Sequence, residues 1–313
     1  MRIASFTALS SSEIFPSSGY DVALIGEAID QRGAEASVFA QERSQKIVKY
    51  QFDATKREHT LDGKEVKLAA VVSLLEGKAR VLLEATTLGV PEIALLMRSL
   101  KVIKTHQFDI LYIEPKTYKQ PAKRRILGNR NFSLTDEQHC LGVPGFTIDF
   151  QQHPKGLFVT FLGYEGQRLT AALNQLPLET QWSKVAVFGV PAFGAGWELN
   201  SLANNIEQIH QNEFQAIIFC AASSVWHSYN LLEEILAQHQ DREAPIVVAP
   251  FGTKPHSIAT ALFLCEHCDF GQTALVFDHP KKSINRSTDM WRWHRYEISE
   301  YGLTATVVED GKI

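Results

Sequence analysis

A short loop near residue 250 brings together the residue types that bind phosphate. Gly252, Thr253 and Lys254 follow the β-branched run 246–249 and precede a stretch of helical length that contains Ser257. Glycine lets the backbone approach a ligand closely, lysine supplies a point charge suited to phosphate, and the hydroxyls can donate hydrogen bonds. A strand followed by a helix start also offers free N–H groups to an anion. The alternative is a capped helix start whose lysine faces water.

Two further loops would lie at the same edge of the sheet if the strands run parallel. Tyr164 and Glu165 stand between glycines after the first strand expected in the second half of the chain, and Ser223 and Ser224 follow the third. Because ligands of open α/β sheets bind beyond the carboxyl ends of the strands, we include all four residues in the candidate ligand site. The same residues also suit tight connections with serine caps, and both interpretations stay open.

Other motifs point away from common cofactors and metals. Gly194 and Gly196 lack the third glycine of a dinucleotide fingerprint, and the chain has no Walker A run. We therefore expect neither an NAD nor an ATP site, and no cofactor. Residues 265–268, Cys-Glu-His-Cys, offer soft ligands, but a structural zinc site needs four and no partnering pair is evident, so we expect no metal.

The elements that would position these loops form an alternating series of strands and helices. Short β-branched runs alternate with apolar stretches of helical length, which indicates a parallel sheet covered by helices. In the second half we expect strands at 158–162, 184–190, 216–221, 246–249 and 273–277, and helices at 165–176, 198–210, 226–238 and 255–265. In the first half we expect strands at 3–8 and 36–40, a helix near 21–31, and a hairpin from 47–52 with an Asp-Gly turn at 61–64; residues 296–298 and 304–308 would add antiparallel edge strands.

The sequence predicts an α/β protein with two lobes, each a Rossmann-like, mostly parallel sheet flanked by helices. We place an N-terminal lobe at 1–150 and a C-terminal lobe at 151–313, because residues 117–156 are rich in Pro, Gly and charge and show little periodicity. Residues 81–116 and 246–281 have equal length and the same boundary residues. Each has a proline in the first helical turn and an acidic residue, Pro and Lys after the second strand. An internal repeat explains this match, although any two βαβ units look alike at this level.

The composition is that of an ordinary globular protein. Apolar residues make up 45% of the 313 residues and the formal net charge is −4, so no overall field attracts polyanions. The N-terminal apolar stretch ends too early for a signal peptide, and no membrane segment is evident. Four scattered cysteines do not form a disulfide framework, so we expect a cytoplasmic protein.

The Gly252-Thr253-Lys254-Pro255 loop, after an apolar strand and before an Ala- and Leu-rich helix, resembles the Gly-Thr-Lys loop of CARF domains. That family comprises Rossmann-like sensor domains of prokaryotic antiviral systems. The resemblance implies that Gly252, Thr253 and Lys254 contact a cyclic oligoadenylate at the interface of a homodimer. Phe251 stands where the family motif often has a second glycine, and the chain lacks the Arg-x4-His motif of a HEPN ribonuclease.

The leading hypothesis is therefore a sensing module that binds a nucleotide or another small phosphorylated ligand, in a defence or regulatory system, as a homo-oligomer or with a protein partner. The first alternative is a phosphodiesterase that degrades such a ligand, similar to a ring nuclease. The second is a structural subunit of a defence complex without a working pocket. Fold analogy alone does not choose among the three.

Overall fold

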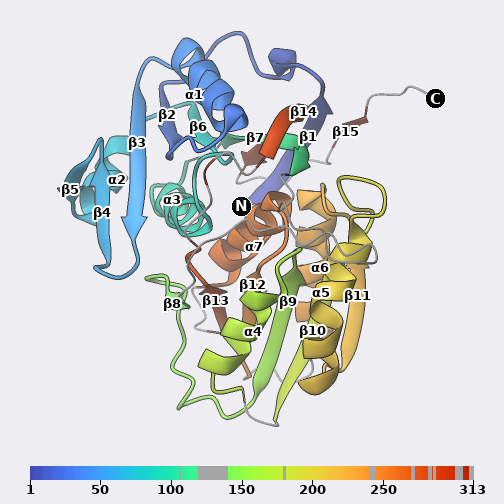
Figure 1. Cartoon of the computed structure of the whole chain (residues 1–313). Helices are drawn as coiled ribbons and strands as arrows, with labels where there is room; N and C mark the ends of the chain where they lie inside the picture. Colours follow the sequence, from blue (N-terminus) through green and yellow to red (C-terminus); the bar gives the residue numbers. More distant parts are fainter. Residues whose placement is uncertain are drawn as a thin grey trace. The chain divides into compact units, whose positions relative to one another are not determined.

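The computed structural model describes residues 1–105, 107–118, 140–178, 181–239, 244–268, 272–280, 284, 287–299 and 306–309 (Figure 1). The chain divides into two compact units. Unit 1 comprises Met1–Tyr118 with Ile284–Ile313, and unit 2 comprises Lys119–Ser283. Each unit is an α/β fold built on its own sheet, as the alternation of strands and helices predicts; the sheet of unit 2 is mostly parallel, and that of unit 1 is mixed with a parallel centre.

Unit 2 is a doubly wound sheet with the strand order β11-β10-β9-β12-β13-β8. The strands are β8 (Leu141–Gly142), β9 (Gly156–Leu162), β10 (Trp182–Gly189), β11 (Ala216–Cys220), β12 (Ile246–Pro250) and β13 (Thr273–Phe277). All neighbouring pairs are parallel except β13 with β8. Every residue of β9, β12 and β13 is buried, as expected for central parallel strands covered on both faces.

Helices cover both faces of this sheet. They are α4 (Gly166–Gln175), α5 (Glu198–Gln211), α6 (Val225–Gln238) and α7 (Lys254–His267). Contacts join α4 to α5 and α6 to α7, so each pair of helices lies on its own face of the sheet (Figure 1). The core between the sheet and the α4–α5 face contains Phe158, Phe188 and Leu169.

Unit 1 contains a nine-stranded sheet in the order β15-β1-β14-β7-β6-β2-β3-β4-β5. Its elements are β1 (Arg2–Leu9), η1 (Ser12–Ile14), β2 (Val22–Ile25), α1 (Gln31–Arg43), β3 (Ile47–Asp53), β4 (Glu58–Leu61), β5 (Lys64–Val66), α2 (Leu68–Leu75), β6 (Val81–Glu84), α3 (Val90–Val102), β7 (Gln107–Tyr118), β14 (Ser287–Ser299) and β15 (Thr306–Glu309). The parallel centre consists of β3, β2, β6 and β7, and the flanking pairs are antiparallel except β1 with β15.

The elements expected in the second half are confirmed, with ends that differ by one or two residues. The Asp-Gly turn is also confirmed: Asp62 and Gly63 both have positive φ and join β4 to β5. Two expectations in the first half are wrong, because residues 22–25 form strand β2 and residues 36–40 lie inside helix α1. Short apolar runs do not distinguish a buried strand from a helix segment, and the N-cap Asp30, whose side chain accepts from Gly33 N, starts the helix later than expected.

The end of the chain belongs to a different sheet from the one we expected. Residues 296–298 lie in β14, which is not an edge strand of the second lobe but pairs with both β1 and β7 in unit 1. Strand β15 does lie at an edge, but it is parallel to β1. The contact division therefore differs from the expected lobes 1–150 and 151–313, because unit 1 is completed by a segment that returns from the far end of the chain.

The two sheets repeat one strand order. In unit 1 the order β3-β2-β6-β7 is followed by antiparallel β14, and in unit 2 the order β10-β9-β12-β13 is followed by antiparallel β8. The segments that match in sequence, 81–116 and 246–281, occupy corresponding places as β6-α3-β7 and β12-α7-β13. The two segments therefore have the same topology, and the internal repeat stays a prediction.

Candidate functional site

The candidate site of unit 2 lies where the winding of the sheet reverses. The chain passes from β9 outward through β10 to β11 and then returns to β12 on the other side of β9. The carboxyl ends of β9 and β12 are therefore neighbours, with α4 beginning after one strand and α7 after the other. This is the position at which open α/β sheets bind their ligands.

The loops after these two strands are in direct contact. A Cβ atom on Gly163 would lie 2.4 Å from the carbonyl oxygen of Phe251, so only glycine allows this approach. The β9–α4 loop with Tyr164 and Glu165 thus lies against the β12–α7 loop with Gly252. Two of the sequence segments predicted to form the site are brought together here.

The third predicted segment joins them through a hydrogen bond. The hydroxyl of Thr253 donates to the carbonyl oxygen of Ala222, which immediately precedes Ser223 and Ser224 in the β11–α6 loop. Thr253 therefore links the two loops that precede α6 and α7. Its hydroxyl is engaged within the protein, so a ligand reaching this loop would meet the backbone and Lys254 rather than this donor.

Side chains of helix α5 also hold the β9–α4 loop in place. Ser201 donates to the carbonyl oxygen of Gly163 over 2.8 Å, and Asn205 Nδ2 donates to the same oxygen over 3.0 Å. Asn204 Nδ2 donates to Tyr164 O over 2.6 Å. Three polar side chains of one helix thus satisfy the backbone of this loop and hold it in one conformation.

Helix α7 begins with a capping box formed by Thr253 and His256. Thr253 is the N-cap residue; its side chain accepts from the backbone of His256, and His256 Nδ1 accepts from Thr253 N over 3.3 Å. Such a capping box satisfies two of the N–H groups that a helix start leaves free. Lys254 is the first residue of the helix and is half-buried. Ser257 is 4% exposed and its hydroxyl donates to Thr253 O over 3.2 Å, so it stabilises the helix start.

The serines of the β11–α6 loop have different roles. Ser224 is the N-cap of α6, and its hydroxyl accepts from His227 N over 3.1 Å. Ser223 is half-buried beside it. Tyr164 and Glu165 are also half-buried, and Glu165 stands at the N-cap position of α4. Of the predicted contacts, Tyr164, Glu165, Ser223, Gly252 and Lys254 are all partly exposed at this edge.

His256 is a buried neutral imidazole at this edge. Its side chain is 0% exposed and stacks on Phe161, with ring centroids 4.8 Å apart. Burial lowers the pKa of His256 to about 4, because the charged form would lose its hydration. The neutral ring keeps Nδ1 as an acceptor for the cap, so His256 acts here as a structural residue near neutral pH.

A buried ion pair at the same edge was missed by the sequence reasoning. Arg168, in the first turn of α4, donates from Nε and Nη2 to the two oxygens of Asp278 over 2.7 and 2.6 Å. Its Nη1 donates to Phe251 O over 3.0 Å, and its guanidinium lies over the rings of Phe251 and Phe277. Burial opposes the charge of Arg168, but the Asp278 carboxylate outweighs burial and raises the pKa of the guanidinium. This pair ties α4 to the ends of β12 and β13.

A sequence feature shared by the two units was a signal for this arginine. Each first helix carries a Gln-Arg pair in its first turn, and Arg32 of α1 is also buried. Arg32 forms an ion pair with Asp30 over 2.7 Å and donates from Nη1 over 3.1 Å to Ile113 O, two residues beyond the part of β7 that pairs with β6. Both units thus use a buried arginine to fasten the first helix to the carboxyl edge of the sheet.

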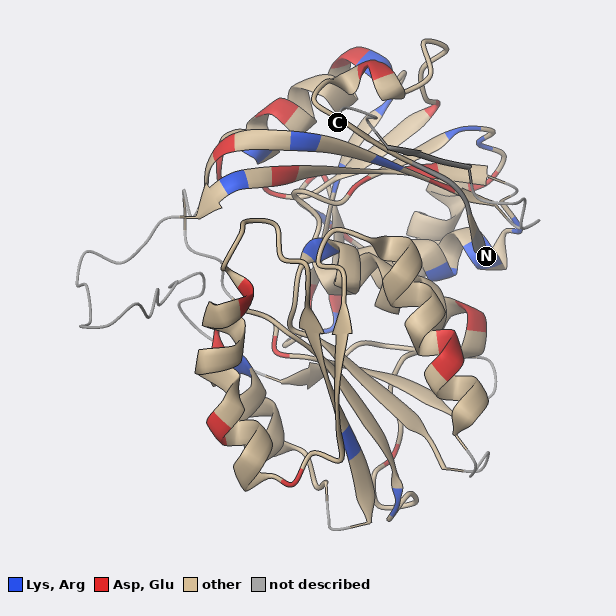
Figure 2. Ribbon diagram, turned by 90° about the vertical axis from the view of Figure 1, so that its right-hand side faces the viewer, with Lys and Arg blue, Asp and Glu red and all other residues tan. Residues whose placement is uncertain are grey.

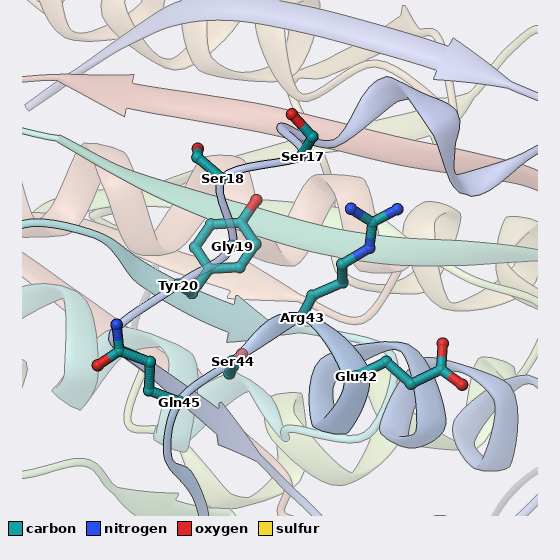
Figure 3. Close-up of a pocket in the computed structure, with 8 residues that line it drawn as sticks. All are labelled: Ser17, Ser18, Gly19, Tyr20, Glu42, Arg43, Ser44 and Gln45. Atoms are coloured by element: carbon teal, nitrogen blue, oxygen red, sulfur yellow. The ribbon is translucent and has the colours of Figure 1, made fainter.

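A separate pocket of about 530 Å³ lies in unit 1 (Figure 3). It is lined by Ser17, Ser18, Gly19, Tyr20, Glu42, Arg43, Ser44 and Gln45. Residues 17–20 precede β2, and residues 42–45 are the end of α1 and the two residues after it, so the pocket lies at the amino ends of the parallel strands. The carbonyl groups at the carboxyl end of a helix disfavour an anion. This pocket therefore does not suit the phosphorylated ligand expected from the sequence.

In the described ranges, no three His, Cys, Asp or Glu side chains gather as a metal site would require, and no helix combines the length and apolar character needed to cross a membrane. Within residues 265–268, His267 Nε2 instead contacts Glu233 over 2.7 Å. Comparison of the chain with protein-family models, with curated proteins and with solved structures found no match. The resemblance of the Gly252 loop to CARF domains therefore stays a prediction.

Proposed function

We propose that unit 2 is a sensing module that binds a nucleotide or another small phosphorylated ligand at the junction of the β9–α4 and β12–α7 loops. The observation that supports this proposal is the close approach of Gly163 to Phe251 at the point where the winding reverses. It brings the starts of two helices, and Lys254 on one of them, to one edge of the sheet.

Each reachable residue has a role that fits its chemistry. Lys254 contacts the phosphate as a point charge, and the backbone at Gly252 approaches it without a side chain in the way. Tyr164 packs against the base or sugar, because its ring is half-buried and lies edge-on to Trp197 with centroids 5.9 Å apart. Glu165 and Ser223 accept or donate hydrogen bonds to hydroxyl groups of the ligand.

The proposal is tested by isothermal titration of the purified chain with common mononucleotides, dinucleotides and cyclic oligonucleotides. We expect at least one to bind, and Lys254→Ala to raise its dissociation constant by about 10- to 100-fold, because a charge-assisted hydrogen bond contributes about 1.5–3 kcal/mol. Lys184→Ala is the matched control: Lys184 is also half-buried, but it lies near the amino end of β10 and its Nζ donates to Asn212 O.

Three outcomes contradict the proposal. If no member of the panel binds, or if the two lysine variants weaken binding equally, the site is not at the Gly252 loop. If products form from a bound cyclic oligonucleotide in a single-turnover reaction, the protein is a phosphodiesterase rather than a sensor alone.

A further inference from the structure

An apolar patch lies at the β11 edge of unit 2. It consists of exposed side chains from helix α5 and strand β11: Leu199, Leu202, Ile206, Ile217 and Phe219. Phe219 is 64% exposed and Leu199 is 63% exposed, although both belong to regular elements of the fold. Large exposed side chains are ordinary when scattered, but a contiguous set marks an interaction surface.

The three α5 residues form one stripe on the helix. Leu199, Leu202 and Ile206 are spaced by three and four residues and so share a face. At about 100° per residue, Leu202 and Ile206 lie roughly half a turn away from Asn204, whose side chain binds the β9–α4 loop. The stripe therefore lies on the side of α5 that is turned away from its contact with the β9–α4 loop.

The two β11 residues are exposed on the same face of the sheet as α5. Phe219 is in register with Phe188 of β10 and Ile217 with Ala186, so both point to the face of the sheet that α4 and α5 cover. The rings of Phe219 and Phe188 lie 6.3 Å apart. Because β11 is the last strand of the order, the cover given by α5 ends here and leaves Ile217 and Phe219 exposed.

Strand β11 is also an edge strand without the usual protection. Within the described part of unit 2 its one strand partner is β10. Its sequence, Ala-Ile-Ile-Phe-Cys, contains no charge and no proline, the residues with which natural edge strands prevent pairing with another chain. Figure 2 looks at the molecule from the side on which Figure 1 places β11. An uncharged edge with an apolar face beside it favours pairing with another strand.

We infer that this surface, the β11–α5 face, joins two copies of this chain in an isologous dimer. A twofold axis through Ile218 makes the two β11 strands antiparallel and places Phe219 of each copy opposite Ile217 of the other, on the same face of the joined sheet. The pairing is self-complementary because each half of the strand is apolar and uncharged. The α5 stripes of the two copies then cover the exposed rings from above.

The exposed apolar area of the β11–α5 face is large enough to form the centre of a dimer interface. From their exposed fractions, and with about 150–200 Å² for a fully exposed side chain, the five residues present roughly 400 Å² of apolar surface. A stable interface buries about 800 Å² on each partner, with an apolar centre and a polar rim. The patch supplies that centre, and exposed polar residues beside it on α5, such as Glu207 and His210, supply a rim. This inference does not depend on the proposed ligand site.

The inference is tested by sedimentation velocity of the full chain over about 1–100 µM. We expect a dimer for the wild type, and for Phe219→Lys a dissociation constant raised by about 30-fold or more, as for a central interface residue. Ile217→Lys is a second variant with the same expected result. Val102→Lys is the matched control, because Val102 is 65% exposed on α3 of unit 1, and it should leave the dimer unchanged.

A cysteine placed on the proposed axis distinguishes this dimer from any other. Ile218→Cys should form a disulfide between two copies, because Cα atoms opposite each other in antiparallel strands lie about 4.5–5.5 Å apart. We expect a covalent dimer on a non-reducing gel that is absent from the wild type. A wild-type chain that is monomeric throughout, a Phe219→Lys variant that stays dimeric with unchanged thermal unfolding, or a dimer without the Ile218→Cys crosslink would overturn the inference.

Discussion

The ion pair between Arg168 and Asp278 should be a main determinant of the stability of unit 2. The side chain of Arg168 is 12% exposed and that of Asp278 is 0% exposed, with N–O distances of 2.6 and 2.7 Å. Replacing Arg168 by Met keeps most of the aliphatic volume but leaves the Asp278 carboxylate buried without its partner. Removing one partner of a buried pair costs about 3–5 kcal/mol, and we expect Arg168→Met to lower the free energy of unfolding by this amount.

Neutralising both partners should restore much of that loss. In Arg168→Met with Asp278→Asn no buried charge remains, and the double variant should be less destabilised than the sum of the two single variants by about 2 kcal/mol. Urea unfolding followed by circular dichroism measures each free energy. Hydrogen exchange of the β12 and β13 amides assigns the loss to unit 2, because Arg168 is bound to both strand ends.

An exposed ion pair provides the control. Lys56 and Glu58 of unit 1 are separated by 4.0 Å and have side chains 66% and 39% exposed, so Lys56→Met should change stability by at most about 0.5 kcal/mol. The reasoning is refuted if Arg168→Met costs no more than Lys56→Met, or if the Arg168 and Asp278 substitutions are additive. Either result would mean that the pair is not coupled in the folded protein.

Two other predictions concern the caps at this edge. The folded-state pKa of His256 is about 4, below the usual value of about 6.5 in the unfolded chain, so its stabilising effect is complete above pH 6.5 and is lost as the pH falls toward 4. His256→Gln keeps an acceptor for Thr253 N but does not titrate. The difference in unfolding free energy between wild type and this variant should therefore change by roughly 3 kcal/mol between pH 6.5 and pH 4. If plots of unfolding free energy against pH stay parallel for the two proteins, the burial of His256 is contradicted. Ser224→Ala should cost about 1 kcal/mol in urea unfolding, whereas Ser224→Asp should cost little because aspartate also caps helices; equal losses would show that Ser224 does not act through the cap.

The sequence determined much of the architecture without help from the structure. In unit 2 the central strands are continuous apolar runs because they are buried on both faces, and helix α4 has one apolar side. Pro255 and the Thr253 cap gave the start of α7, and Asp62-Gly63 gave a hairpin turn, because these signals depend on a few adjacent residues. The loops of the candidate site could therefore be located from the succession of strands and helices along the chain.

The tertiary structure decided the features that depend on distant partners. Arg168 and Asp278 are 110 residues apart, and neither residue type signals a buried pair until the fold brings them together. Strand β14 joined unit 1 because its pairing with β1 and β7 satisfies a row of backbone groups that no local pattern can assign. The exposure of Phe219 likewise followed from the place of β11 at the end of the sheet, since the same apolar run in a central strand would be buried.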